Sequence, residues 1–113
     1  MTVRRVRLAV LPRGDEVLPV RIAEWPSKRR EAIVMRDESG VLRAYFNECR
    51  HVPIPLDSGG RKFTNTEGLL ECKTHGALYR KGDGECVSGP CMGSRLIPVE
   101  IEDDALIIDE TVV

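Results

Sequence analysis

Two short segments of this sequence each combine a cysteine with a histidine. Cys49 and His51 are separated by one residue, and Cys72 and His75 by two. The chain has 113 residues and only two histidines, so its whole histidine complement lies beside cysteines. Thiolate sulfur and imidazole nitrogen bind soft and borderline metal ions, and the two segments together would supply four ligands. The spacing therefore predicts a four-coordinate metal site.

Two metal chemistries could use these four ligands. Zinc fingers usually take two cysteines from one short segment and two histidines from the other. Here each segment mixes the two residue types, which suits a [2Fe–2S] cluster in which one iron binds both thiolates and the other binds both imidazoles. A zinc-stapled interaction domain without redox chemistry stays open as the alternative.

With these motifs, the chain resembles the Rieske-type [2Fe–2S] ferredoxins. Gly76 directly follows the second Cys/His pair, as in the second ligand loop of that family. The segment from Gly84 to Pro90 is similar to the loop that covers the cluster. The resemblance extends over nearly the whole chain, from about Val6 to Ile108. It implies one [2Fe–2S] cluster, with the metal ligands Cys49, His51, Cys72 and His75.

The residues expected around the cluster differ from those of high-potential relatives. Those relatives have a serine two residues after the second ligand histidine and a tyrosine four residues after it, where this chain has Ala77 and Tyr79. Gly89 and Pro90 would belong to the covering loop. One hydrogen-bond donor would be lost and one kept, and such donors tune the reduction potential. We therefore expect a low to middling potential within the Rieske range of roughly −150 to +300 mV.

Three further positions depart from the family pattern. Pro53 replaces the glycine that usually follows the first ligand histidine by two residues, and proline stiffens a turn. Ile54 and Thr74 stand where respiratory relatives carry the extra cysteines of a disulfide between the ligand loops. That disulfide cannot form in this chain.

Cys86 and Cys91 lie outside the two ligand segments, in the expected covering loop. Three alternatives are open for them: two free packed thiols, a disulfide within the loop, or a further metal-binding or redox-sensing role. A disulfide needs Cα atoms within about 7 Å of each other, and reducing compartments disfavour it. The spacing alone is compatible with all three.

The composition limits the partners that we expect. Charged residues make up 31% of the chain and the formal net charge is −1, so there is no overall attraction to nucleic acid. No apolar run approaches the roughly 18 residues of a membrane span, and the apolar run after Arg4 and Arg5 is too short for a secretory signal. We therefore expect neither a nucleic acid nor a membrane as partner. We expect a cytoplasmic location, where thiols stay reduced.

The elements that position the ligand pairs are expected to be strands. Short stretches rich in β-branched and aromatic residues alternate with turns, and no window shows a helical period with caps. We expect strands at residues 3–10, 17–23, 31–36, 41–47, 62–64, 69–71, 77–80, 85–87, 96–102 and 105–109. Alternation along residues 41–47 places Leu42, Ala44 and Phe46 on one face, which should be the core face. The predicted fold class is all-β.

The resemblance adds an architecture to this prediction. It implies stacked antiparallel sheets with a small cluster-binding subdomain at one tip. That subdomain would span about residues 47–92 of a single Rieske domain over residues 1–113.

The resemblance also implies a function. Nothing in the sequence pairs a nucleophile with a base, and the cluster irons would be saturated by ligands. We therefore expect no enzyme by itself but a small soluble one-electron carrier, which passes electrons from a flavoprotein reductase to a terminal oxygenase or another acceptor. The second alternative is a Rieske-type small subunit of a larger reductase, such as nitrite reductase.

Basic residues near the ligands suggest how a partner docks. Arg50 and Lys73 lie beside ligands in the two loops, and we expect them to attract an acidic redox partner. They would belong to a basic collar that also includes Arg61, Lys62, Arg80, Lys81 and Arg95.

Overall fold

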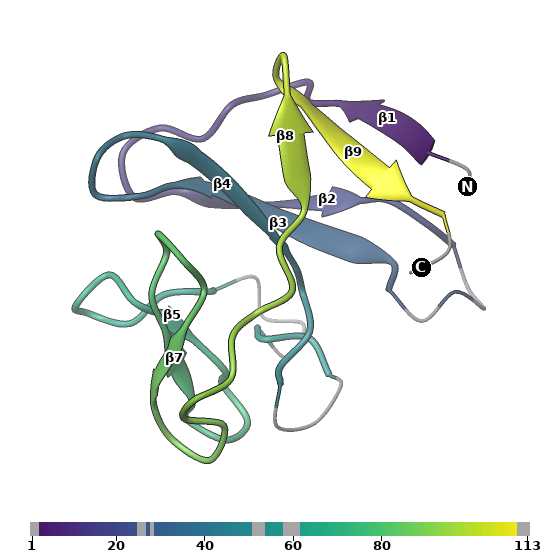
Figure 1. Ribbon diagram of the computed structural model, residues 1–113. Coiled ribbons are helices and arrows are strands. Elements are labelled where there is room, and N and C mark those ends of the chain that lie inside the picture. The colour runs from purple at the N-terminus through teal and green to yellow at the C-terminus, as the bar shows by residue number, and fades with distance from the viewer. Residues whose placement is uncertain (1–2, 25–26, 28, 51–53, 58–61, 111–113) are drawn as a thin grey trace.

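The computed structural model describes residues 3–24, 27, 29–50, 54–57 and 62–110. In this part of the chain there are nine β-strands and no helix (Figure 1). Among these residues, accordingly, no helix is long and apolar enough to cross a membrane. The strands form three antiparallel sheets of three strands each. The all-β prediction is confirmed.

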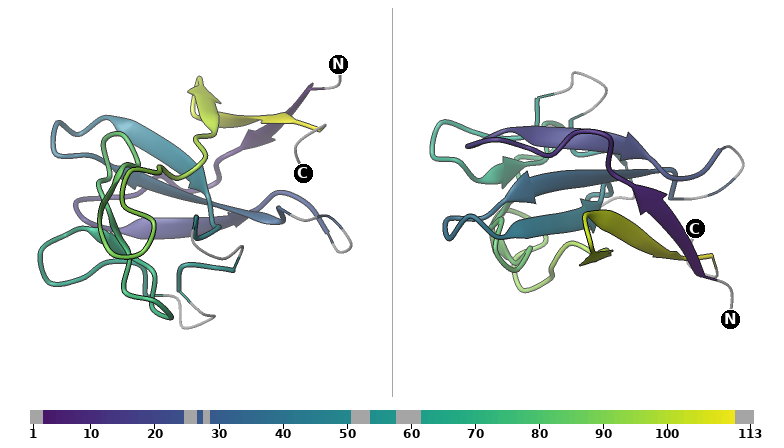
Figure 2. Two further views of the ribbon diagram at one scale, coloured as in Figure 1. Left: turned by 60° about the horizontal axis from the view of Figure 1, so that its bottom comes forward. Right: turned by 90° about the horizontal axis from the view of Figure 1, so that it is seen from above.

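One of the three sheets is central, and the other two pack against it. The central sheet has the order β2-β3-β4, the outer sheet β1-β9-β8 and the small sheet β5-β6-β7. Figures 1 and 2 show the outer sheet and the small sheet on different sides of the central sheet. The strands are β1 (Val3–Arg7), β2 (Val17–Arg21), β3 (Glu31–Arg36), β4 (Leu42–Phe46), β5 (Leu70–Glu71), β6 (Leu78–Tyr79), β7 (Cys86–Ser88), β8 (Glu100–Glu102) and β9 (Ala105–Asp109).

The central sheet is buried on both faces. Ala44 and Phe46 of β4 pack into a core shared with the outer sheet, as the alternation predicted, and Leu42 packs against its margin. The opposite face of β4 is a core face as well, because Tyr45 is also buried, at 3% exposure. Tyr45 belongs to a second core, which the small sheet completes. A strand buried on both faces cannot show a simple polar and apolar alternation.

The segment before β8 binds to the central sheet instead of the outer one. The Phe46 amide donates to the Ile97 carbonyl at 2.9 Å, and the Val99 amide donates to the Ala44 carbonyl at 2.9 Å. The strand expected at residues 96–102 therefore begins only at Glu100. The strand expected at residues 62–64 was also wrong, since it is reduced to an isolated bridge between Thr64 and Leu70.

Tyr45 fastens the small sheet to the central sheet. Its hydroxyl donates to the Lys81 carbonyl at 2.6 Å, and burial raises the pKa of Tyr45 to about 12, so it remains a donor at neutral pH. Its ring lies against Gly84, where an added Cβ would come 2.7 Å from Cε1 of the ring. The turn at residues 81–84 can approach the central sheet because glycine stands at this position.

We expect Gly84→Ala to destabilise the protein by about 1–3 kcal/mol more than Gly68→Ala, because only Gly84→Ala adds an overpacking clash. Gly84 and Gly68 both have positive φ, at +72° and +80°, and nothing lies within 4 Å of a Cβ at Gly68. The cost of placing alanine at positive φ is therefore shared. Urea unfolding of both variants measures the difference, and equal destabilisation would contradict this account of the Tyr45 contact.

Candidate metal centre

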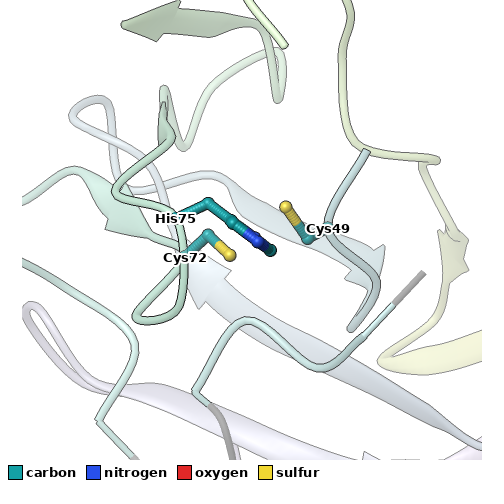
Figure 3. Close-up of side chains that lie close together, drawn as sticks. All are labelled: Cys49, Cys72 and His75. Carbon is teal, nitrogen blue, oxygen red and sulfur yellow. The ribbon is translucent and has the colours of Figure 1, made fainter. Parts of the chain in front are cut away.

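Three of the four predicted ligands converge between the first ligand loop and the small sheet. The ligand atoms of Cys49, Cys72 and His75 all lie within 4.8 Å of one another, and Figure 3 shows the three side chains pointing into the same space. Cys49 and Cys72 are buried, at 1% and 0% exposure, whereas His75 is exposed. Sulfur therefore lies on the inner side of the site and nitrogen on the outer side. The fourth predicted ligand, His51, lies outside the described residues, as does Pro53.

Asn47 holds both ends of the first ligand loop. Its side-chain oxygen accepts a hydrogen bond from the Leu56 amide at 2.8 Å, and its side-chain nitrogen donates to Glu31 of β3 at 2.8 Å. Across the same loop, the Cys49 amide donates to the Ile54 carbonyl at 2.8 Å. Cys49 is thus placed by a closed loop anchored to the central sheet.

The second ligand loop is a tight turn that connects β5 to β6. The Gly76 amide donates to the Cys72 carbonyl at 2.8 Å, and the Cys72 amide donates to the Ala77 carbonyl at 2.9 Å. The Lys73 amide reaches across to the Leu56 carbonyl at 2.8 Å. This last bond joins the two ligand loops directly, so Cys49 and Cys72 are held together by the backbone.

The surroundings of Cys72 favour a metal-bound thiolate. Burial raises the pKa of the Cys72 thiol, while the backbone amides of His75 and Thr74 hydrogen-bond to it and act in the opposite direction. A buried thiolate without a compensating positive charge is costly. Bound iron would supply that charge, and the two amides are already aimed at the sulfur.

Tyr79 lies beside the other thiol. Its hydroxyl oxygen is 3.5 Å from Sγ of Cys49 and 2.8 Å from Sγ of Cys91, and it accepts a hydrogen bond from the Arg50 amide at 3.1 Å. Burial is the largest cause that raises the pKa of Tyr79. The hydroxyl therefore stays protonated and has one hydrogen to give to a neighbouring sulfur.

The loop expected to cover the cluster packs directly on the second ligand loop. Gly89 has a φ of +103°, and an added Cβ would come 2.7 Å from Cα of Ala77, which is fully buried. Pro90 follows at an exposed position. The two loops can pack backbone against backbone because Gly89 has no side chain and Ala77 has only a methyl group.

The two basic residues next to the ligands form ion pairs. Arg50 lies 3.5 Å from Glu48, and Lys73 lies 2.6 Å from Glu71. Arg80, which was expected in the same basic collar, pairs with Asp83 at 2.8 Å and with Glu85. The positive charge around the site is therefore smaller than the sequence suggested. Arg61 of the collar lies outside the described residues.

Sequence reasoning missed two residues that shape the site. Asn47 was treated only as the end of a strand, although its side chain is buried and hydrogen-bonds to Glu31 and Leu56. Asp57, 3% exposed, lies 3.4 Å from the Asn47 side-chain nitrogen. Neither contact could be predicted from local spacing, because each joins residues ten or more positions apart.

The fold and the site define an iron–sulfur protein, and comparison with known families agrees. The family model for the Rieske [2Fe–2S] domain matches residues 10–103. The chain belongs to this family, whose cofactor is one [2Fe–2S] cluster. Zinc as the resident metal is thereby set aside.

The chain is similar to parts of longer proteins. Oxidoreductase NdmD of Pseudomonas putida is 36% identical over 61 residues, which is 54% of this chain and 10% of NdmD. The terminal oxygenase of carbazole 1,9a-dioxygenase from Novosphingobium sp. KA1 has a TM-score of 0.64 at 21% identity, over 93% of this chain and 28% of the oxygenase. Apo dicamba monooxygenase has a TM-score of 0.60 at 20% identity, over 97% of this chain and 35% of the monooxygenase. The chain thus spans only about a third or less of these relatives, and the two structures show the fold alone.

The residues present fit a [2Fe–2S] cluster. Two buried sulfurs with amide and hydroxyl groups around them suit the iron that binds thiolates, and an exposed imidazole suits the other iron.

We expect Gly89→Ala to lose iron faster than Gly93→Ala. A methyl group at Gly89 must displace the Ala77 backbone, whereas nothing lies within 4 Å of a Cβ at Gly93, where φ is +96°. Both variants share the cost of positive φ, so the difference reports the contact between the covering loop and the second ligand loop. The decay of visible absorbance in excess chelator measures it, and identical decay rates would show that this contact does not protect the site.

Proposed function

We propose that this chain is a one-electron carrier. The cluster takes up and returns a single electron when it is bound. Cys49 and Cys72 would hold one iron, and His51 and His75 would hold the other. The observation that carries the proposal is the arrangement of two buried thiols beside an exposed imidazole within 4.8 Å.

The protein would control where the electron leaves. The buried side of the site is closed by Cys49, Cys72 and Tyr79, each at most 1% exposed. His75 is exposed, so its imidazole would offer the electron a path to a partner at the surface. With all iron positions taken by ligands, no substrate would bind the metal, and transfer would be outer-sphere.

The same residues support a low to middling potential. The side chain of Ala77 has no hydrogen-bond donor, and the single hydrogen of the Tyr79 hydroxyl has a closer acceptor in Cys91, at 2.8 Å, than in Cys49, at 3.5 Å. Fewer hydrogen bonds to cluster sulfur mean less stabilisation of the more negative, reduced state.

We propose a flavoprotein reductase as electron donor and a terminal oxygenase or reductase as acceptor. Two proteins that this chain is similar to, an oxidoreductase and a terminal oxygenase, support this class of partner. We further propose that residues 1–113 act as one Rieske domain with the cluster held by about residues 47–92, since the core around the site also includes Ile33 and Met35 of β3.

A second candidate function is that of a component within a larger oxidoreductase, such as the small subunit of a reductase. The match to only 10% of NdmD favours it, because there the matching segment is a small part of a larger protein. Reduction of the isolated, cluster-loaded chain by a flavoprotein alone would support the free carrier. Copurification with one large subunit, without such reduction, would support the component.

We expect the purified chain to hold two irons and two acid-labile sulfides and to give a Rieske-type paramagnetic signal on reduction. His75→Ala should lose most of the iron, because one iron loses a ligand. Thr74→Ser, a change at the neighbouring position that keeps the backbone amide, should retain it. Iron analysis and electron paramagnetic resonance of the three proteins test this. Full iron with an unchanged signal in His75→Ala would refute the ligand assignment.

We propose that Arg50 and Lys73 help to dock an acidic partner despite their ion pairs. Arg50→Gln and Lys73→Gln should each slow electron transfer to such a partner a few-fold at low salt, with the difference shrinking as salt is added. Arg21→Gln is the matched control, because Arg21 also pairs with a glutamate, Glu24 at 3.2 Å, but belongs to β2, which carries no ligand. Stopped-flow kinetics at several ionic strengths measures the effect. Equal rates in all three variants would remove these residues from the docking surface.

A further inference from the structure

Two cysteines that the cluster does not need lie in contact next to the site. Sγ of Cys86 and Sγ of Cys91 are 3.2 Å apart, and the residues are 1% and 6% exposed. The Cys86 amide donates to the Ser94 carbonyl at 2.8 Å, and the Ser94 amide donates to the Cys91 carbonyl at 2.9 Å. The backbone therefore closes the turn that carries both sulfurs and holds them face to face.

The hydrogen bonds of this pair run in one direction and begin at Tyr79. Sγ of Cys91 donates to Sγ of Cys86, and Sγ of Cys86 donates to the Ser88 carbonyl at 3.2 Å. Each thiol has one hydrogen, so both are used within the turn. Sγ of Cys91 then serves as acceptor for the Tyr79 hydroxyl at 2.8 Å.

Cys49 competes with Cys91 for the same hydrogen. Tyr79 has one hydroxyl hydrogen, and Sγ of Cys49 is farther from the oxygen, at 3.5 Å. The Arg50 amide donates to the Tyr79 oxygen. This bond leaves the hydroxyl with one hydrogen for the two sulfurs. While Cys91 is a thiol, the Tyr79 hydroxyl makes its closer contact with Cys91 and its longer one with the sulfur of Cys49.

We propose that Cys86 and Cys91 form a redox-active dithiol whose oxidation to a disulfide transfers the Tyr79 hydrogen bond from Cys91 to Cys49 and thereby raises the electron affinity of the cluster. The oxidant would be a low-molecular-weight disulfide. Two thiols of the protein become one disulfide, the reagent's disulfide becomes two thiols, and two electrons and two protons pass from the protein to the reagent.

Forming this disulfide changes the position and the chemistry of the Cys91 sulfur. The two sulfurs must close from 3.2 Å to about 2.05 Å, which pulls Cys91 toward Cys86. The disulfide has no hydrogen to donate, so Cys91 is no longer polarised as an acceptor by its own hydrogen bond. The Tyr79 hydroxyl can then turn to Cys49, and a hydrogen bond to ligand sulfur stabilises the reduced cluster.

The rate of oxidation is expected to be slow. Burial raises the pKa of Cys86 to about 11, so its reactive thiolate is scarce at neutral pH. In a reducing compartment the pair would rest as thiols, and it would be oxidised only slowly. The test is therefore made at equilibrium.

The experiment uses the cluster-loaded wild-type chain, equilibrated anaerobically in glutathione buffers of increasing oxidised fraction. After denaturation, mass spectrometry counts the cysteines that can still be alkylated. We expect the count to fall from four, the number of free cysteines, to two without an attached glutathione. In the same samples we expect the electron affinity of the cluster to rise roughly tenfold, a shift of about +59 mV.

Two variants separate the coupling from the disulfide itself. Cys86→Ser keeps Cys91 as the acceptor for Tyr79 but cannot close, so its potential should not respond to glutathione. Tyr79→Phe should form the disulfide as the wild type does but lose most of the shift, because the positioning hydroxyl is gone. A merely structural role for Tyr79 would leave the shift in place.

Three results would overturn the proposal: four alkylated cysteines at every buffer ratio, a stable glutathione adduct in place of the disulfide, or an equal shift in Tyr79→Phe. None of these measurements uses a reductase or an acceptor protein. If the dithiol proposal failed, the electron-carrier proposal would still stand. If the electron-carrier proposal failed, the expected thiol count would not change.

Discussion

The burial of two thiols on the inner side of the site is the constraint on which the rest of the structure depends. Cys49 and Cys72 lie almost wholly out of water, where a thiolate is stable only with positive charge and hydrogen-bond donors around it. The chain supplies donors through the amides of Thr74 and His75, and iron would supply the charge. The exposed imidazole of His75 then connects a dry interior to the surface.

Holding those thiols requires the loops to be anchored from outside. The first ligand loop is anchored to the central sheet by the hydrogen bond between Asn47 and Glu31. The backbone hydrogen bond between Lys73 and Leu56 joins it to the second ligand loop. Because the central sheet is buried on both faces, it couples the core of the outer sheet to the core around the site. The site is therefore positioned by backbone bonds and a shared core, and not by metal ligation alone.

The neighbourhood of Tyr79 shows how one hydroxyl can serve two sulfurs. In many metal sites the groups behind the ligands are as important for the potential as the ligands themselves. Here the hydroxyl lies between Cys49, a predicted ligand, and Cys91, which is not one. A chemical change at a residue that never touches iron could therefore alter the potential, because a single hydrogen is shared between the two acceptors.

The chemistry of the site was predictable from residues that are close together in the chain. The two mixed Cys/His motifs are local, so their residue types and spacing predicted an iron–sulfur cofactor without knowledge of the fold, and the family match agrees. The strands at residues 31–36 and 105–109 were predicted with their observed bounds, since β-branched residues and flanking turns define them locally.

The groups that surround the site could not be predicted in the same way, because they depend on how distant segments pack. The second core under Tyr45, the anchoring of the first ligand loop by Asn47 and the contact between Tyr79 and Cys91 all join residues from separate elements. The ion pairs that weaken the basic collar are formed by neighbouring residues, yet only side-chain geometry shows that they form. Local patterns specify which groups are present, whereas the packing of distant segments determines which of them touch.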